Sequence, residues 1–270
     1  MATEYLTNDI ELTSVADAIR AKSGQTGQLI YPDGFVSAVS GIKKAPTTPY
    51  MEAVYTTVYP VGDSSGSHYI TRAKLYNHTA IYAYEFSGQK KLQNLDFSDA
   101  SNNIRAIESG AFNLAQVNGL VLPNTIRVLG TACFGGAAIV TLTIPPLVTV
   151  LPGSAFEDVQ PVYNDATDEE LPINIILPQN LTKIETRCFM SAEIKQIIIP
   201  DMVTQIGDMA FNHCRRLASI TCLAATPPTL GRSVFRSSTA GFTIKVPAAS
   251  VAAYKAADGW KDYASYIVAM

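Results

Sequence analysis

The sequence predicts a mainly β protein with some α-helix: a solenoid of repeats of about 22 residues, with a small helical N-terminal module and a C-terminal cap. Three observations predict this fold class. Phenylalanines recur at a fixed step, prolines recur at the same step, and two columns of aliphatic residues keep the same register. A fixed internal period of roughly 20 to 50 residues is the signature of a repeat architecture, in which each unit buries its apolar side against its neighbours.

The phenylalanine and proline series share one irregularity. The phenylalanine gaps are 22, 22, 33, 22 and 24 residues, and the proline gaps are 22, 33 and 22. A gap of 33 is one repeat plus an insertion of 11 residues, which falls within VQPVYNDATDEELP, the most acidic stretch of the chain. The two series are Phe112, Phe134, Phe156, Phe189, Phe211 and Phe235, and Pro123, Pro145, Pro178 and Pro200.

Each unit reads approximately as I-x-x-I-x-x-x-A-F, a variable bend, and then L-x-L-P. The alternating pair before each proline predicts a short strand with one buried face, and the proline ends the strand because it has no N–H to donate. We expect each phenylalanine to stack on those of the neighbouring units inside the solenoid. The alternating exposed positions form two rows: Val121, Thr143, Ile176, Ile198 and Thr221, and beside it Gly119, Thr141, Asn174, Gln196 and Ser219.

The first of these rows is uncharged and holds several aliphatic side chains. We predict that it contacts a partner, because a contiguous apolar surface favours protein contact. The alternative interpretation is an ordinary sheet face that binds nothing.

Units such as IRVLGTACFGGAAIVTLTIP and VTQIGDMAFNHCRRLASITC resemble the BspA-like, or Treponema-type, leucine-rich repeats. The resemblance implies a leucine-rich-repeat solenoid over about 60% of the chain, in which Gly130 and Gly207 match the glycine of the family pattern. The segment from TPPTLGRSVF onward resembles the closing segment of such arrays. It implies a strand and a terminal helix, with Tyr254, Trp260 and Tyr263 covering the last repeat.

The first 45 residues do not follow the repeat. The spacing of Leu12, Val15, Ala16 and Ile19 is that of an amphipathic helix. A second short helix is expected after Pro32, and KKAPTTPY then has the composition of a linker. Both helices need a partner to cover their apolar sides, and the residues expected to dock on it are Leu12, Val15, Ile19, Phe35, Val39 and Ile42.

The string LTSVADAIRAKSG, followed by YPDGFVSAV, resembles a segment at the start of tail-associated proteins in phages and prophages of Gram-positive bacteria. Such proteins are usually homo-oligomers, most often trimers. The predicted organisation is therefore a docking module over 1–45, a linker and cap strands over 46–80, a leucine-rich-repeat solenoid over 81–246, and a C-terminal cap over 247–270. After the cap strands, Tyr84, Phe86, Leu95 and Phe97 are expected to form a degenerate first repeat.

Composition narrows the function classes. The net charge is -3 and only 16% of residues are charged, so the sequence does not predict nucleic-acid binding. No stretch predicts a transmembrane helix or membrane insertion. The N-terminus MATEYLTNDIELTSVADAIR lacks the basic and apolar regions of a secretory signal peptide. We therefore expect a protein made in the host cytoplasm that stays there or leaves by a route such as cell lysis.

The potentially reactive side chains favour structural interpretations. His213 beside Cys214 could suggest a metal or Cys/His catalytic site, but Cys214 matches a packing position of the family pattern. The four cysteines (Cys133, Cys188, Cys214 and Cys222) are expected to be free thiols, since none forms a C-x-x-C pair. The acidic residues of the insertion are expected to form a solvated loop, with a contact loop as the alternative: Asp165, Asp168, Glu169 and Glu170.

No motif predicts an enzyme, a metal or a cofactor. The sequence is therefore interpreted as a non-enzymatic phage or prophage tail-associated protein, located on the virion. Its N-terminal module would bind tail or baseplate proteins, and its solenoid would bind a host cell-surface protein or glycan. The alternative is a bacterial BspA-like surface adhesin or protein-interaction scaffold.

Overall fold

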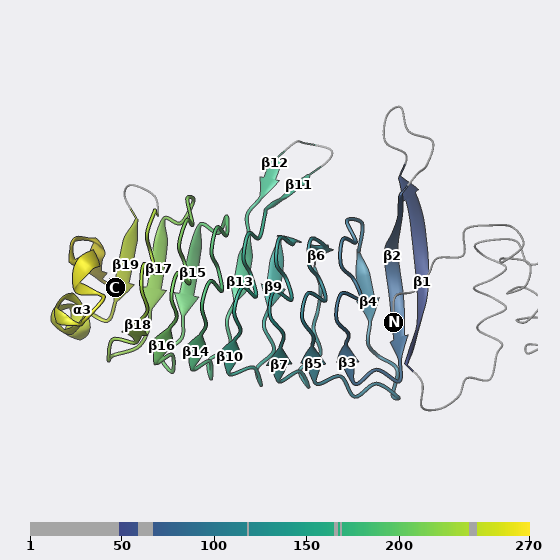
Figure 1. Cartoon of the computed structure of the whole chain (residues 1–270), viewed down its shortest axis with the longest axis horizontal. Helices are drawn as coiled ribbons and strands as arrows, with labels where there is room; N and C mark the ends of the chain where they lie inside the picture. The colour runs from purple at the N-terminus through teal and green to yellow at the C-terminus, as the bar shows by residue number, and fades with distance from the viewer. Residues whose placement is uncertain (1–48, 59–66, 118, 165–166, 168, 238–241) are drawn as a thin grey trace, which may run out of the picture.

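A computed structural model describes residues 49–58, 67–117, 119–164, 167, 169–237 and 242–270. These residues form an elongated solenoid whose turns follow one another from the N-terminal to the C-terminal end (Figure 1). The solenoid fold predicted from the repeat is confirmed. Two series of short parallel strands run along it, and we call them the long-strand ladder and the short-strand ladder.

The long-strand ladder holds strands of three or four residues. It comprises a pair, β9 and β13, and a sheet in the order β15-β17-β19-β20, all parallel. These strands are β9 (Thr141–Thr143), β13 (Asn174–Ile176), β15 (Gln196–Ile199), β17 (Ser219–Cys222), β19 (Thr243–Val246) and β20 (Ile267–Ala269).

The short-strand ladder holds strands of two residues, which the sequence did not predict as strands. It comprises the sheets β3-β5-β7 and β10-β14-β16-β18, again parallel. These strands are β3 (Ala80–Ile81), β5 (Ala106–Ile107), β7 (Val128–Leu129), β10 (Val150–Leu151), β14 (Lys183–Ile184), β16 (Gln205–Ile206) and β18 (Thr229–Leu230).

The core between the ladders is built on a column of stacked phenylalanines. Successive ring centroids from Phe86 to Phe235 lie 5.1–5.8 Å apart, with interplanar angles of at most 22°. The stack predicted from the sequence is confirmed, and Phe86 begins it one unit earlier. The two aliphatic columns are buried beside it: Ile104, Ile126, Val148, Leu181 and Val203, and Ile107, Leu129, Leu151, Ile184 and Ile206.

Each bend of the solenoid contains two residues with positive φ, four positions apart, and most are not glycine. Left-handed backbone costs free energy in a residue with a side chain. The bends offset that cost with hydrogen bonds between repeats. For example, the N–H groups of Ala132, Phe134 and Gly136 donate to carbonyl oxygens of the next repeat at 3.2, 2.9 and 2.7 Å. The two columns are Tyr84, Gly110, Ala132, Ser154, Arg187, Met209 and Ser233, and Gly88, Leu114, Gly136, Asp158, Ser191, His213 and Ser237.

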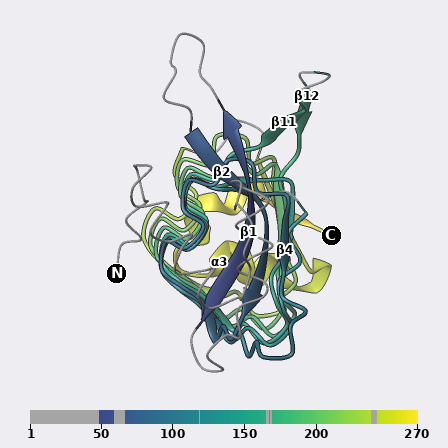
Figure 2. The ribbon, with the colours of Figure 1, turned by 90° about the vertical axis from the view of Figure 1, so that its right-hand side faces the viewer.

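A β-hairpin covers the N-terminal end of the solenoid (Figure 2). Strands β1 (Tyr50–Val58) and β2 (Ser67–Tyr76) are antiparallel, and β2 also pairs in parallel with β4 (Asn94–Asp96). The expected cap strands are therefore present. Of the expected first-repeat residues, Phe86 and Leu95 are buried and Phe97 packs against the core. Tyr84 is 66% exposed and occupies a bend position instead.

The C-terminal end is closed by a 3₁₀-helix, η1 (Ala248–Ser250), then α3 (Val251–Ala256) and a second 3₁₀-helix, η2 (Lys261–Tyr266). Tyr254 and Trp260 are fully buried, and their polar atoms donate to the carbonyl oxygens of Ala224 and Pro228 at 2.8 and 2.7 Å. Tyr263 packs on the ring of Phe235. The covering role expected for these three aromatic residues is confirmed.

Two expectations about local structure are wrong. The segment 119–122 is not a strand. The preceding strand β6 (Gln116–Val117) pairs with β8 (Ala138–Ile139), and Gly119 then takes a φ of +70°, which interrupts the extended backbone. The acidic insertion is not simply a loop. It contains an antiparallel hairpin of β11 (Val162–Asn164) and β12 (Glu169–Leu171) that projects from the solenoid (Figure 1).

Candidate binding surface

The exposed row predicted from the sequence lies on the long-strand ladder. Thr143 is the register partner of Ile176, and Ile198 is the register partner of Thr221. Ile176 and Ile198 are 46% and 58% exposed, which is unusual for isoleucine because burying such a side chain is worth about 1.5–3 kcal/mol. The row continues beyond Thr221 to Lys245 and then Val268.

Val121 belongs to this row only by its repeat position. Its side chain is 80% exposed, but it lies in the segment 119–122, outside any strand. Its neighbour Leu122 is buried at 6% exposure, so the expected alternation of exposed and buried side chains is still present there. The aliphatic row therefore begins outside the ladder and enters it at Thr143.

The neighbouring row is also uncharged. Thr141, Asn174 and Gln196 are exposed, and Ser219 is half-buried. Register pairing aligns Thr141 with Asn174 and Gln196 with Ser219. From Thr141 to Thr221, the outward positions of β9, β13, β15 and β17 thus carry no charge, and such a surface loses little hydration energy when a partner covers it.

A cluster of charged side chains lies beside this surface. Glu170 on β12 reaches Arg216 at 2.7 Å and Lys195 at 3.3 Å, and Arg216 also reaches Glu193 at 3.0 Å. Lys195 directly precedes β15, so these contacts tie the hairpin to the next two repeats. The hydrogen bond from Arg216 is the main cause that lowers the pKa of Glu170, and it likewise raises the pKa of Arg216.

The hairpin carries one large exposed aromatic residue. Tyr163 on β11 is 55% exposed and is the register partner of Glu170. Cross-strand partners lie on the same face of a β-ladder, so Tyr163 shares a hairpin face with the residue that holds the ion pairs. Of the acidic residues singled out in the sequence, Glu169 is exposed on β12, whereas Asp165 and Asp168 lie outside the described residues.

The short-strand ladder presents a different surface. Val128 and Val150 are 58% and 37% exposed. The register partner of Val150 is the charged residue Lys183, whose ammonium group pairs with Glu185 at 3.0 Å. The hydroxyl of Thr182 donates to the carbonyl oxygen of Thr149 at 2.9 Å, one repeat before it. The hydroxyl of Thr229 on β18 likewise donates to the carbonyl oxygen of Thr204 at 3.2 Å, so several polar side chains on or beside this ladder bond within the solenoid.

The groups considered for catalysis or metal binding point apart. His213 is exposed, whereas Cys214 is fully buried with its Sγ 2.9 Å from the carbonyl oxygen of Phe189. The four cysteines are buried and free, and burial raises the pKa of Cys133, Cys214 and Cys222 to about 12. Within the described part of the chain, no group of three or more His, Cys, Asp or Glu side chains could hold a metal ion.

The predicted docking residues of the N-terminal module lie outside the described residues. They are Leu12, Val15, Ile19, Phe35, Val39 and Ile42. Their docking role stays a prediction. In contrast, the Glu170–Arg216 cluster was missed at the sequence level, because the two residues are 46 positions apart and belong to no shared motif.

The sequence profile of the family described as "BspA type Leucine rich repeat region" matches the chain in six copies, over residues 65–163 and 169–254. The match thus covers more than half of the chain, and it includes the long-strand ladder up to β19. No curated protein matches the sequence.

Three solved structures are similar to this one. They are the pneumococcal vaccine antigen PcpA (17% identity, TM-score 0.28), a leucine-rich cell-surface protein of Faecalibacterium prausnitzii (17%, 0.28) and a leucine-rich-repeat protein of Bacteroides ovatus (18%, 0.29). The alignments cover 69%, 62% and 71% of this chain, and 63%, 56% and 69% of those chains. This chain therefore spans less than two thirds of the first two, and similarity at this level assigns no function.

Proposed function

Because this chain belongs to the BspA-type leucine-rich-repeat family, we propose that it is a bacterial surface adhesin or protein-interaction scaffold. Its binding surface is the uncharged part of the exposed row on the long-strand ladder, from Thr143 to Thr221, and its partner is a macromolecule on a cell surface. No chemical step is part of this proposal, since leucine-rich-repeat solenoids typically serve as binding surfaces.

One observation carries the proposal: the pair Ile176 and Ile198, 46% and 58% exposed on adjacent parts of a rigid ladder. Large aliphatic side chains on one face that lack any charged neighbour in their row mark a contact surface. Stacked repeats hold that surface rigid, so little conformational entropy is lost on binding.

The hairpin β11–β12 supports the proposal as a boundary of this surface. Its ion pairs with Lys195 and Arg216 hold it over the two repeats that follow. Exposed ion pairs add little stability, but they fix an orientation and impose electrostatic selectivity at the rim of an interface. Tyr163 is an aromatic residue of the kind enriched at protein interfaces.

Adherence of protein-coated beads tests the proposal. Beads carrying the full chain are applied to cultured epithelial cells and, separately, to Gram-positive bacterial cells. We expect adherence to epithelial cells that soluble chain competes away, and at least tenfold less adherence for the double variant Ile176→Asp and Ile198→Asp. A chain that adheres to neither cell type, or a double variant that adheres normally, would overturn the proposal.

A second candidate function follows from one sequence feature, the resemblance of residues 12–39 to the start of phage tail-associated proteins. In this candidate, the N-terminal module binds tail or baseplate proteins, and an oligomer, most often a trimer, presents the solenoid to a bacterial host. No helix in the described residues is long and apolar enough to cross a bilayer.

Substitutions in the full chain separate the two candidates. Val15→Asp and Ile19→Asp place charges on the apolar side of the predicted first helix. The phage candidate predicts that this variant still binds bacterial cells through the solenoid but no longer enters virions. If the chain never enters virions, or if it adheres to epithelial cells alone, the second candidate is wrong.

A further inference from the structure

The final repeat is not followed by another repeat, and this leaves backbone donors without their usual partners. In the inner repeats, the N–H of the first positive-φ residue donates to a carbonyl of the next repeat, as Arg187 does to Asp208 and Met209 does to Arg232, both at 2.9 Å. Ser233 occupies the same position in the final repeat. Its N–H meets no acceptor among the residues that the structure describes.

The C-terminal cap replaces only part of the missing repeat. The N–H of Phe235, which would donate to a following repeat, donates instead to the hydroxyl oxygen of Tyr263 at 3.4 Å. The cap thus covers the phenylalanine column but leaves the outer part of the bend open. A cavity of about 670 Å³ remains there, within the size range of ligand pockets.

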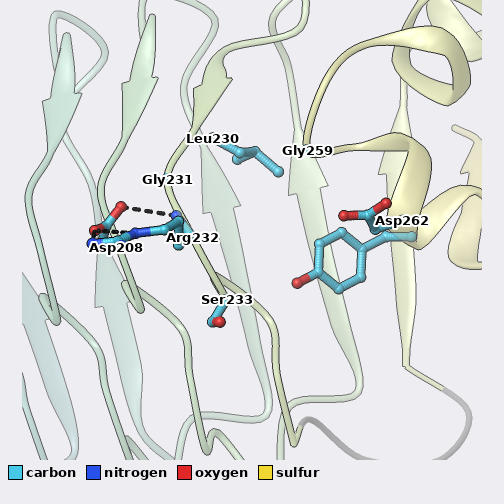
Figure 3. Close-up of a pocket in the computed structure, with 8 residues that line it drawn as sticks. Asp208, Leu230, Gly231, Arg232, Ser233, Gly259 and Asp262 are labelled. Atoms are coloured by element: carbon cyan, nitrogen blue, oxygen red, sulfur yellow. Dashed lines mark hydrogen bonds and ion pairs between the residues drawn. The ribbon is translucent and has the colours of Figure 1, made fainter.

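The polar groups that line this cavity are of mixed kind. On one side, the carboxylate of Asp208 accepts from the backbone N–H of Arg232 at 2.8 Å and from its guanidinium at 3.2 and 3.3 Å. The Arg232 side chain is 91% exposed and keeps unused donors. On the other side lies Asp262 (Figure 3). The cavity therefore offers donors (Arg232 and the Ser233 N–H), two carboxylate acceptors and two hydroxyls.

Two glycines in the wall of the cavity pack closely against neighbouring residues. A Cβ at Gly231 would lie 2.4 Å from the backbone nitrogen of Asp208, and Gly259 has a φ of +79° with Leu230 3.0 Å from its ideal Cβ. Each position excludes a larger side chain for steric or conformational reasons. The remaining walls are apolar, formed by Leu230 and the half-buried ring of Tyr263.

We propose that this cavity binds a neutral saccharide unit. Each sugar hydroxyl both donates and accepts, so vicinal hydroxyls satisfy the carboxylate, the guanidinium and the Ser233 N–H together. The carbon-bound hydrogens of the sugar pack on Leu230 and Tyr263. This inference does not depend on the exposed row, because the cavity lies at the end of the short-strand ladder, where β18 meets the cap.

Charged ligands fit the cavity less well. A carboxylate would face Asp208 and Asp262, which carry the same charge. An ammonium group has no acceptor, so it would leave the donors of Arg232 and the Ser233 N–H without a partner. A peptide backbone offers one donor and one acceptor per residue, and peptide sites ordinarily use a sheet edge or an apolar groove. Because β18 is the edge strand of its sheet and its Leu230 lines the cavity, a peptide is the alternative occupant that the experiment must exclude.

Backbone NMR of the full chain tests the proposal. The probes are the methyl glycosides of glucose, galactose, mannose and N-acetylglucosamine, each titrated separately, with blocked triglycine as the peptide probe. We expect at least one glycoside to shift the amide signals of Ser233 and Gly259 saturably. Asp262→Ala should weaken that binding by roughly tenfold, since it removes a hydrogen bond to a charged group.

Asp258→Ala is the matched control. Asp258 belongs to the same cap and is 96% exposed, but it pairs with Lys261 and does not line the cavity. We expect this variant to bind the glycoside as the unchanged chain does. The proposal is overturned if no glycoside moves the Ser233 amide, if triglycine moves it instead, or if the Asp258 and Asp262 variants weaken binding equally.

Discussion

The two ladders of the solenoid are built from the same repeat, but their exposed side chains differ in how often they bond to a neighbouring repeat. Just before the strands of the short-strand ladder, the hydroxyls of Thr182 and Thr204 donate to carbonyl oxygens of the preceding repeat, at 2.9 and 3.3 Å. On the long-strand ladder, the hydroxyl of Thr243 makes one such bond, to Ala218 at 3.4 Å, but Ile176 and Ile198 are 46% and 58% exposed. The outward side chains from Thr141 to Thr221 are therefore available to a partner, whereas several beside the short-strand ladder bond to a neighbouring repeat.

This difference shows why exposure alone does not identify a binding surface. Val128 on the short-strand ladder and Ile198 on the long-strand ladder are both 58% exposed and β-branched. Their surroundings differ. Val128 directly follows the charged residue Arg127, whereas Ile198 lies in a row whose side chains are uncharged up to its register partner Thr221. Five experiments test this difference between the two ladders and the core that they share.

The largest effect is expected in the core, which both ladders share. Phe134→Ala and Phe211→Ala should each destabilise the chain by about 3–5 kcal/mol, because each leaves a cavity in the phenylalanine stack. Thermal and chemical unfolding measure the loss. If both variants melted like the unchanged chain, the phenylalanine stack would not be the core of the solenoid.

The second effect concerns the close packing of bends beside the short-strand ladder. A Cβ at Gly130 would lie 2.3 Å from the backbone nitrogen of Ser109, whereas a Cβ at Gly153 would meet its nearest atom at 3.4 Å. Gly130→Ala should therefore cost about 1–3 kcal/mol, and Gly153→Ala should cost almost nothing. Equal denaturation midpoints for the two variants would contradict this packing.

The third effect tests the comparison itself. Thr182→Val removes the hydroxyl that bonds to Thr149 and should cost about 0.5–1.5 kcal/mol. Thr143→Val, on the exposed row of the long-strand ladder, removes a hydroxyl directed to solvent and should change stability by less. Urea unfolding of both variants measures the difference, and a larger loss for Thr143→Val would reverse the assignment of the two ladders.

The smallest effect is expected at the hairpin. Because the pKa of Glu170 is lowered in the folded chain, its ion pairs stabilise the hairpin above the unfolded pKa near 4.5 and are lost as the pH falls through the folded value. NMR shifts of the Tyr163 and Glu170 amides should report a transition below that pH. In Arg216→Ala, the transition should move upward, and an unchanged transition would show that Arg216 does not hold the hairpin.

The sequence predicted those features that repeat with the period of the fold. The phenylalanine column and the aliphatic columns could be found because each places one large, buried apolar side chain in every unit, such as Phe134 or Leu151. The short-strand ladder could not, since a two-residue strand buries a single side chain and leaves no alternation. Its pairing depends on neighbouring repeats, as between Ile184 and Ile206.

Other features depend on contacts that no local pattern records. Ala132 and Met209 adopt positive φ without being glycine, because bonds to the next repeat offset the strain. The acidic insertion forms a hairpin partly through the pairing of Glu170 with Arg216, two repeats later. For the candidate surface, the sequence predicted which residues are exposed but placed Val121 on a strand that Gly119 prevents.

If the chain binds its partner through the long-strand ladder, a charge placed there should abolish adherence, and the same charge on the short-strand ladder should not. Ile198→Glu and Val128→Glu place the same charge at positions of equal exposure, one on each ladder. Both variants should unfold at the same temperature as the unchanged chain. We predict that adherence to cells falls at least tenfold for Ile198→Glu and is unchanged for Val128→Glu, whereas equal adherence of the two variants, or a loss confined to Val128→Glu, would contradict the claim.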